Sequence, residues 1–301
     1  MRSVTVSVPA STSNLGSGFD TLGLALRLYT TVCITTTAEK GIAVVPPPAG
    51  KHNPAARHLV TEAAGLFFQR THNEPCGIEV CLTSEVPIAR GLGYSSTVRV
   101  GVLAALNELT RAGLDRNDLL QLAAELEGHP DNASPAIFGG FTVSGRIGSK
   151  VRCFRFPVSS YVKFITLVPR FAVSTEKARK LMPIIYSRTD AAHALNRSAL
   201  VTAAFSSGDY AALRGVFDDR MHQPYREKLV SGLNKVVQAG ERAGAIGGFL
   251  SGSGSSIICV TLENERAVAK AMRSQLHDSS AIRLSADNEG FRLIKAKRHG
   301  P

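Results

Sequence analysis

The 301-residue chain has no tryptophan and no apolar run approaching the roughly 18 residues that a membrane-spanning helix needs. Its first residues, MRSVTVSVPASTSNLG, alternate apolar and polar side chains, unlike the continuous apolar stretch of a secretory signal peptide. The five cysteines are scattered, odd in number and form no C-x-x-C pair, which argues against a disulfide framework. We therefore expect a cytoplasmic protein with no membrane partner.

Acidic residues are the minority charge. The chain carries 24 Asp and Glu against 35 Lys and Arg, a formal net charge of +11. Such an excess favours anionic partners, either nucleic acid or small phosphorylated and carboxylated molecules. The basic residues are not interleaved with aromatic residues that could stack on bases. We expect a small anionic ligand and no nucleic-acid partner.

Strands and helices are mixed in both halves of the chain. Alternation of apolar and β-branched residues predicts strands at Val4–Val8, Thr31–Thr37, Gly77–Pro87, Val162–Pro169, Ser256–Leu262 and Gly290–Lys297. Helical spacing and caps predict helices from Pro54 (N-cap Asn53), at Val98–Gly113, after Asp115 as far as Glu127, and at Thr175–Leu181, Ala191–Phe205 and Arg226–Ala243. Strict βαβ alternation is missing. The pattern therefore predicts an α+β protein with two domains, residues 1–150 and 151–301.

The stretch RGLGYSST joins a predicted strand to a predicted helix. Gly91 and Gly93 let the backbone approach a ligand closely and take up positive φ angles. The free N–H groups and the dipole of the following helix favour an anion. This is not the common G-x-x-x-x-G-K-[ST] phosphate loop, and an ordinary glycine turn capped by Ser95 or Ser96 is the alternative.

Three further segments make the pattern more specific. PASTSNLGSGFDTLGLAL (Pro9–Leu26) is a polar, small-residue loop, ELEGHPDNASPAIFGGF contains an acidic turn, and GGFLSGSGSSIICV is a second glycine-rich loop. Together with RGLGYSST they resemble, in sequence and in order, the motifs of the GHMP small-molecule kinases. The likeness covers nearly the whole chain, and EGHPDN, STEKARKLMP and LSGSGSSI are most similar to the members that phosphorylate L-homoserine.

The resemblance implies a ribosomal-S5-like N-terminal domain and a ferredoxin-like C-terminal domain with ATP held between them. It implies ATP-dependent transfer of a phosphoryl group to the side-chain hydroxyl of L-homoserine, giving O-phospho-L-homoserine for threonine biosynthesis. ATP and Mg²⁺ would be the cofactors, the partner would be a small-molecule substrate, and a homodimer would be the oligomeric state.

The resemblance also assigns roles to individual residues. The ATP phosphate segment would be Pro87, Ile88, Ala89, Arg90, Gly91, Leu92, Gly93, Tyr94, Ser95, Ser96 and Thr97. Ser95 and Glu127 would support Mg²⁺, although Glu127 could also be an ordinary solvated glutamate at a helix end.

The remaining roles concern the amino-acid substrate. Its ammonium would meet Asp20, and its carboxylate would meet Arg179 or, as second choice, Arg226. Further substrate contacts would come from Asn14, Asn132 and the backbone at Gly252. Asp131 is available as a general base but ranks below Asn132, and His129 is expected to stabilise the turn.

The chain departs from the family at Tyr94, where a serine is usual, and SSTVRV replaces the usual run of alanines. A glycine-flanked loop can hold a tyrosine whose ring points out of the phosphate cradle. Two other functions stay open: a GHMP kinase for another alcohol such as threonine or mevalonate, and a non-catalytic ligand-binding or RNA-binding relative. The chain has no H-E-x-x-H zinc motif and no G-x-S-x-G nucleophile elbow between a strand and a helix.

Overall fold

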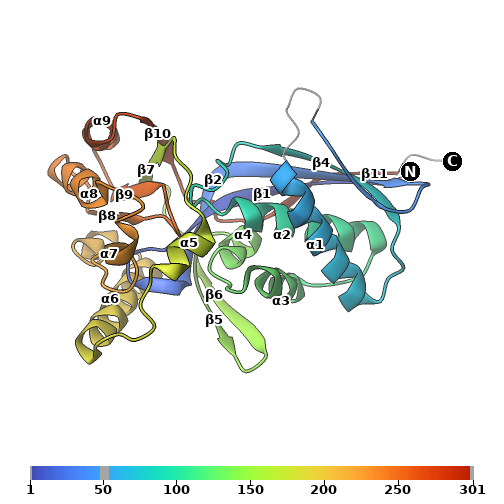
Figure 1. Ribbon diagram of the computed structural model, residues 1–301, viewed down its shortest axis with the longest axis horizontal. Helices are drawn as coiled ribbons and strands as arrows, with labels where there is room; N and C mark the ends of the chain where they lie inside the picture. Colours follow the sequence, from blue (N-terminus) through green and yellow to red (C-terminus); the bar gives the residue numbers. More distant parts are fainter. Residues whose placement is uncertain (1, 48–53, 299–301) are drawn as a thin grey trace.

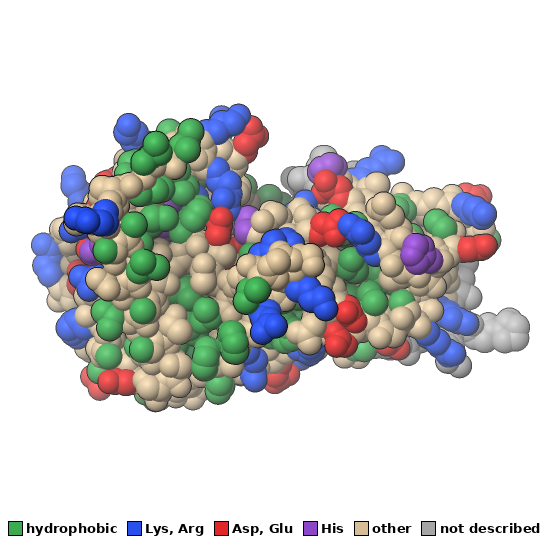
Figure 2. All heavy atoms as spheres, turned by 90° about the horizontal axis from the view of Figure 1, so that it is seen from below, with side chains coloured by type: hydrophobic (Ala, Val, Ile, Leu, Met, Phe, Trp, Pro, Cys, Tyr) green, Lys and Arg blue, Asp and Glu red, His purple; other side chains and the backbone are tan. Residues whose placement is uncertain are grey.

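The computed structural model describes residues 2–47 and 54–298, which form two lobes, each built on its own sheet (Figure 1). The predicted N-cap Asn53 lies outside the described residues. In the described part of the chain, no helix combines the length and apolar character needed to cross a bilayer. Lys and Arg side chains are spread over both lobes on the face that Figure 2 shows.

The larger lobe contains a seven-stranded sheet in the order β11-β1-β2-β4-β3, with β5 pairing with β2 and with β6. Its strands are β1 (Arg2–Asn14), β2 (Gly18–Thr37), β3 (Ile42–Val45), β4 (Gly77–Ser84), β5 (Phe141–Ile147), β6 (Lys150–Phe156) and β11 (Arg292–Arg298). The apolar positions predicted for the first strand are buried, as Val4, Val6 and Val8 show. β1 and β2 form a long antiparallel hairpin.

Helices pack beside this sheet as α1 (Pro54–Thr71), α2 (Tyr94–Thr110), α3 (Arg116–Glu127) and α4 (Ala133–Phe138) (Figure 1). The prediction for α3 is confirmed: Asp115 and Asp118 form a capping box, and Gly128 ends the helix in the left-handed region. The predicted stop of α2 at Gly113 is wrong. Arg111 already takes the left-handed conformation, with φ 56°, and its N–H bonds to the carbonyl of Asn107.

The smaller lobe contains a four-stranded antiparallel sheet in the order β10-β7-β9-β8. Its strands are β7 (Lys163–Pro169), β8 (Gly247–Leu250), β9 (Ile257–Thr261) and β10 (Ser279–Leu284). Its helices are α5 (Thr175–Lys180), α6 (Arg188–Ser207), the 3₁₀ turn η1 (Tyr210–Leu213), α7 (Gln223–Arg226), α8 (Leu233–Arg242) and α9 (Glu265–Gln275). The chain order β7-α8-β8-β9-α9-β10 confirms the ferredoxin-like prediction.

Two predicted elements are wrong. The polar segment Pro9–Leu26 is not a loop but the paired ends of β1 and β2, in which Ser11 and Thr12 are fully buried opposite Ala25 and Leu24. The polar side chains gave no strand signal. This end of the hairpin lacks alternation of apolar and polar residues, and its polar side chains are buried by other segments of the protein. The predicted helix Arg226–Ala243 is broken at Gly232, whose φ of 89° is incompatible with a continuous helix.

The division of the chain at residue 150 stays a prediction. Sheet membership does not follow that point, because β6 and β11 both pair within the larger sheet. The two chain ends described by the structure thus meet on the same lobe (Figure 1).

Candidate active site

A cavity of about 400 Å³ lies where loops of the two lobes meet. Most of the predicted site residues line it: Asn14, Asp20, Ile88, Ala89, Arg90, Gly91, Leu92, Gly93, Tyr94, Ser95, Glu127, Asp131, Asn132, Arg179, Arg226 and Gly252. Three predicted residues do not line it. Pro87 is half-buried outside it, and Ser96 and Thr97 are fully buried, with the Thr97 hydroxyl donating to the carbonyl of Tyr94 at 2.8 Å.

In the glycine loop, the carbonyl groups of residues 89–92 point into the protein. Four consecutive carbonyls accept hydrogen bonds from other segments: Ala89 from the Val173 N–H, Arg90 from the Ser256 N–H, Gly91 from the Ser251 hydroxyl and Leu92 from the Ser11 N–H. A trans peptide holds its C=O and N–H on opposite sides, so the N–H groups of residues 90–93 point away from these partners. The free N–H groups of the first turn of α2 follow directly, which makes this wall suited to an anion.

Both loop glycines are required, but for a reason different from the expected approach of a ligand. A Cβ on Gly91 would lie 2.0 Å from the Ser251 carbonyl oxygen, and one on Gly93 would lie 2.1 Å from the Ser11 hydroxyl. Their φ angles, 73° and 70°, are in the left-handed region. Close contact with the protein itself therefore demands glycine at both positions.

Two predicted metal-supporting residues meet at the start of α2. The Ser95 hydroxyl donates to Oε2 of Glu127 at 3.1 Å, and the Glu127 side chain is 7% exposed. The other carboxylate oxygen, Oε1, accepts from Arg99 at 2.7 Å, and the second terminal nitrogen of Arg99 reaches Glu62 at 2.8 Å. Burial alone would lower the pKa of Arg99, but the two carboxylates raise it above its usual value. Glu127 is thus an ion-paired, inward-facing residue, not a solvated helix-end glutamate.

The opposite wall of the cavity carries paired charges. Arg179 on α5 donates to both carboxylate oxygens of Asp20, at 2.6 and 3.0 Å. The ring of Phe19 lies near both guanidinium groups, 5.2 Å from Arg179 and 5.3 Å from Arg226. Two cations and one carboxylate therefore face the same space.

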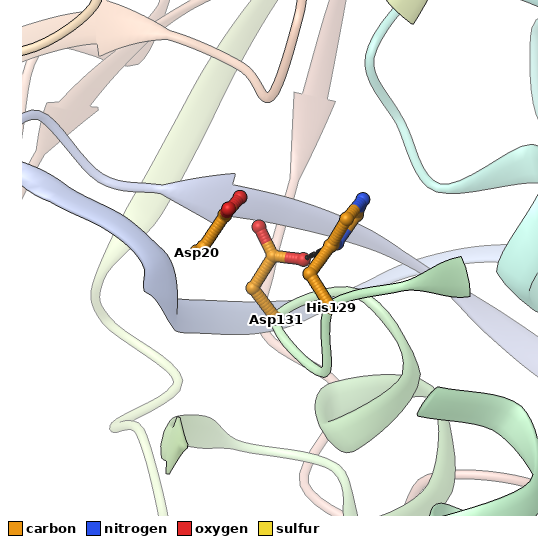
Figure 3. A group of neighbouring side chains, drawn as sticks. All are labelled: Asp20, His129 and Asp131. Carbon is orange, nitrogen blue, oxygen red and sulfur yellow. Dashed lines mark hydrogen bonds and ion pairs between the residues drawn. The ribbon is translucent and has the colours of Figure 1, made fainter. Parts of the chain in front are cut away.

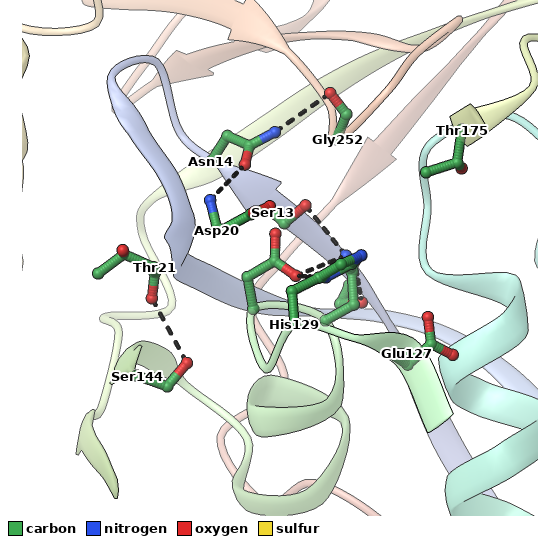
Figure 4. A network of polar contacts seen from close by, with 12 residues as sticks. Ser13, Asn14, Asp20, Thr21, Glu127, His129, Ser144, Thr175 and Gly252 are labelled. Atoms are coloured by element: carbon green, nitrogen blue, oxygen red, sulfur yellow. Dashed lines mark hydrogen bonds and ion pairs between the residues drawn. The ribbon is translucent and has the colours of Figure 1, made fainter. Parts of the chain in front are cut away.

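Arg226 is the most buried of these charges, with 2% of its surface exposed. Burial first, and then the charge of Arg179, lower its pKa to about 10, so it stays cationic at neutral pH. It donates to the Gly252 carbonyl at 3.0 Å, and the Asn14 amide donates to the same carbonyl at 3.2 Å. Figure 4 shows Asn14 bridging Gly252 and the backbone of Asp20.

His129 and Asp131 form a close pair beside Asp20 (Figure 3), with 2.5 Å between Nδ1 and Oδ1. Burial alone would lower the pKa of His129, but the bond to Asp131 raises it. Burial would likewise raise the pKa of Asp131, and the bond and charge of His129 lower it. His129 does brace the turn as predicted, but it also lines the cavity, which makes it a polar group facing the site.

Hydrogen bonds to both the oxygen and the nitrogen of its side-chain amide fix the orientation of Asn132. Its Oδ1 accepts from the Ser11 hydroxyl at 2.9 Å, and its Nδ2 donates to Ser13 Oγ at 3.1 Å and to Asp131 Oδ1 at 3.2 Å. The strand end that was predicted as a loop thus supplies the groups that orient Asn132.

Tyr94 begins α2 with its side chain only 8% exposed. It belongs to the hydrophobic core of the larger lobe and also lines the cavity. The ring is therefore packed into the protein beside the glycine loop, which is compatible with a loop whose anion-facing groups belong to the backbone.

Several residues of this cavity and its rim were given no site role from the sequence, among them Phe19, Arg99 and His129. The only signal for Arg99 was its place in SSTVRV, where a charge interrupts an otherwise small and apolar helix start. Phe19 gave none, because a lone phenylalanine in a polar stretch does not indicate which cations it will contact.

Comparison with known proteins defines the class. The family model described as GHMP kinases N terminal domain matches residues 58–140, and that described as GHMP kinases C terminal matches residues 191–278. The chain belongs to the GHMP kinase family and has its two-domain fold.

Individual relatives indicate which members of the family the chain resembles. The chain is 36% identical over 304 residues to a homoserine kinase of Caldicellulosiruptor bescii, with 98% of each chain covered. It is also similar to the crystal structure of homoserine kinase from Cytophaga hutchinsonii, with a TM-score of 0.86, 26% identity and 97% of each chain covered. A mevalonate kinase of Methanococcus jannaschii shares the fold alone, with a TM-score of 0.70, 16% identity and coverage of 94% of this chain and 98% of that one.

Proposed function

We propose that this protein uses ATP to phosphorylate the side-chain hydroxyl of L-homoserine, giving O-phospho-L-homoserine for threonine biosynthesis in the cytoplasm. The observation that carries the proposal is the Asp20–Arg179 ion pair facing the same cavity as the glycine loop. The similarity to homoserine kinases over nearly the full chain supports it.

The ion pair suits a zwitterion. An amino acid can replace the Asp20–Arg179 contact with two contacts of its own, ammonium to Asp20 and carboxylate to Arg179, and leave no charge unpaired. Arg226 offers a second cation to the carboxylate. Mevalonate has a carboxylate but no ammonium, so moving Arg179 from Asp20 to that carboxylate would leave Asp20 without a partner in a partly enclosed site, which is costly. This difference favours an amino acid over mevalonate.

The wall of the cavity formed by residues 88–95, here called the loop wall, would hold the triphosphate of ATP. The N–H groups of residues 90–93 and the first turn of α2 supply donors that need no side chain. Ser95 Oγ and Glu127 Oε2 fit Mg²⁺, because they are oxygen ligands 3.1 Å apart and Mg²⁺ commonly takes only one or two from the protein. When bound, the ion would neutralise charge on the transferring phosphoryl group.

A second group could hold a metal. Ligand atoms of Asp20, His129 and Asp131 lie within 4.8 Å of one another. Both Asp20 oxygens are already bound by Arg179, and Asp131 is bound by His129, so Ser95 and Glu127 remain the better pair.

In the reaction, the substrate hydroxyl oxygen bonds to the γ-phosphorus, the bond to the β–γ bridging oxygen breaks, and the hydroxyl proton is released. Asn132, held rigidly by Ser11 and Ser13, would orient that hydroxyl. The proton would pass to water or to a phosphate oxygen. Asp131 ranks below Asn132 as the residue that contacts the hydroxyl, since His129 and Asn132 already occupy its Oδ1. Most of the rate enhancement would then come from positioning and charge neutralisation.

The test is ADP release with ATP and Mg²⁺ across L-homoserine, L-threonine, mevalonate and a sugar. We expect L-homoserine to give the highest kcat/KM. A tenfold advantage for mevalonate or a sugar, about 1.4 kcal/mol of transition-state stabilisation, would show the substrate assignment to be wrong. Ligand binding without ADP release from any substrate would favour the non-catalytic alternative. A homodimer and the lack of a nucleic-acid partner stay predictions.

A further inference from the structure

Arg99 is a charged residue outside the roles assigned so far, yet it contacts the proposed metal ligand directly. It lies one helical turn after Ser95 on α2, and its side chain is only 12% exposed. Its two terminal nitrogens each bind a different carboxylate, Glu127 at 2.7 Å and Glu62 at 2.8 Å.

The two carboxylate oxygens of Glu127 therefore have different partners. Oε1 is held by Arg99, whereas Oε2 is directed to Ser95 at the edge of the cavity. For both oxygens to bind one metal ion, Oε1 would have to be shared between the ion and the Arg99 cation, or the largely buried ion pair would have to break, and either is unfavourable. Glu127 is thus prepared to give a metal one oxygen.

Glu62 restores the charge that Arg99 removes. Arg99, Glu127 and Glu62 carry formal charges of +1, −1 and −1, so the group keeps a net charge of −1, equal to that of Glu127 alone. His58, which lines the cavity, reaches the other oxygen of Glu62 at 3.3 Å. The Arg99 contact therefore restricts geometry without cancelling the attraction for a cation.

We propose that Arg99 is a positioning residue that confines Glu127 to one-oxygen coordination and thereby makes the site select Mg²⁺ over Ca²⁺. The inference rests on the proposed function, which places the metal–nucleotide complex at Ser95 and Glu127. Mg²⁺ demands near-ideal octahedral geometry at short distances, whereas Ca²⁺ readily takes both oxygens of one carboxylate at longer distances. Removing the restraint on Oε1 should help Ca²⁺ more than Mg²⁺.

The test compares wild type with Arg99→Met and with the double variant Arg99→Met/Glu62→Gln. The double variant keeps the net charge of −1 and removes only the restraint, so it separates geometry from charge. Glu62→Gln alone is the matched control, because it leaves the Arg99–Glu127 contact in place. The measurement is displacement of bound Mn²⁺ by Mg²⁺ and by Ca²⁺, followed by electron paramagnetic resonance, with a non-hydrolysable ATP analogue present.

We expect the ratio of Ca²⁺ to Mg²⁺ dissociation constants to fall at least about tenfold in both variants that lack Arg99. In Glu62→Gln both ions should bind more weakly by a similar factor, with the ratio unchanged. An unchanged ratio in a folded double variant that still binds Mn²⁺ would overturn the role of Arg99 and leave the proposed function intact. A wild type that binds no Mn²⁺ with the ATP analogue would overturn both.

Discussion

One wall of the cavity presents backbone groups and the other presents charged side chains. The loop wall, residues 88–95, presents backbone N–H groups because its carbonyls are bound by other segments of the protein. The charged wall presents the side chains Asp20, Arg179 and Arg226. A wall of backbone groups tolerates exchange of its side chains, as Tyr94 in place of serine illustrates, but does not tolerate atoms that shift the backbone. A wall of side chains should show the reverse behaviour.

The largest effect is expected at the proposed metal ligands Ser95 and Glu127. Glu127→Gln should lower kcat by at least about a hundredfold, because a neutral amide holds Mg²⁺ poorly. Glu125→Gln is the matched control, since Glu125 lies on the same helix but pairs with Arg70 on the surface. Steady-state kinetics at saturating Mg²⁺ checks both variants. Near-wild-type turnover in Glu127→Gln would remove this residue from the site.

On the charged wall, Arg179→Ala should raise KM for L-homoserine by about thirtyfold, since it removes the cation that would bind the substrate carboxylate. KM for ATP should stay within about twofold, because the loop wall is unchanged. Lys180→Ala, which removes a neighbouring but exposed cation paired with Glu176, should change neither constant. A selective loss of ATP affinity in Arg179→Ala would place the arginine on the nucleotide instead.

On the loop wall, Gly91→Ala should raise KM for ATP by about tenfold or more, because its Cβ would collide with the Ser251 carbonyl and displace the loop. Gly113→Ala is the control for backbone strain alone. It has the same φ of 73° but nothing within 4 Å of the added Cβ. Equal kinetics for the two variants would contradict the packing role of Gly91.

Tyr94→Ser should separate stability from binding. Loss of a buried ring from the core should lower the free energy of unfolding by about 3 kcal/mol, whereas KM for ATP should change less than about threefold. Tyr94→Phe should change KM for ATP little, since the backbone donors remain. Urea unfolding and ATP titration measure the two effects, and a loss of ATP affinity in Tyr94→Phe would show that the phenol takes part in binding.

The smallest expected effect concerns His129 and Asp131. The pKa of His129 is raised in the folded state, so its contribution to stability is complete below its unfolded pKa, near 6.5, and is lost as pH rises through the folded value. The lowered pKa of Asp131 makes its contribution complete above about 3.9 and lost at still lower pH. The difference in unfolding free energy between wild type and His129→Gln should therefore be largest, about 1–2 kcal/mol, near pH 5–6 and shrink toward pH 9. A difference independent of pH would contradict the charged pair.

Regular patterns made much of the fold predictable. The capping box at Asp115 and Asp118 and the apolar alternation from Val4 to Val8 are local signals, and both were interpreted correctly. The strand end at Ser11 and Thr12 was not, because those polar residues are buried by contacts from segments distant in the sequence, such as the Ser251 hydroxyl. The local preference of a sequence for helix or strand does not depend on such distant contacts and so cannot predict them.

The candidate site shows the same limit. Motif resemblance indicated Asp20, Glu127 and Arg179, which the fold brings to one cavity. It gave no pairing between them, because a salt bridge such as that of Asp20 with Arg179 joins residues 159 positions apart. Arg99 was missed for a related reason: its importance comes from the carboxylates that α1 and α3 bring beside it.

The central claim is that Asp20 recognises the ammonium group of an amino-acid substrate. The most direct measurement is kcat/KM for L-homoserine and for 4-hydroxybutanoate, which keeps the hydroxyl and carboxylate but lacks the ammonium, in wild type and in Asp20→Asn. We expect wild type to prefer L-homoserine by at least about a hundredfold, and Asp20→Asn to lose most of this preference. An equal preference in both proteins would contradict the account.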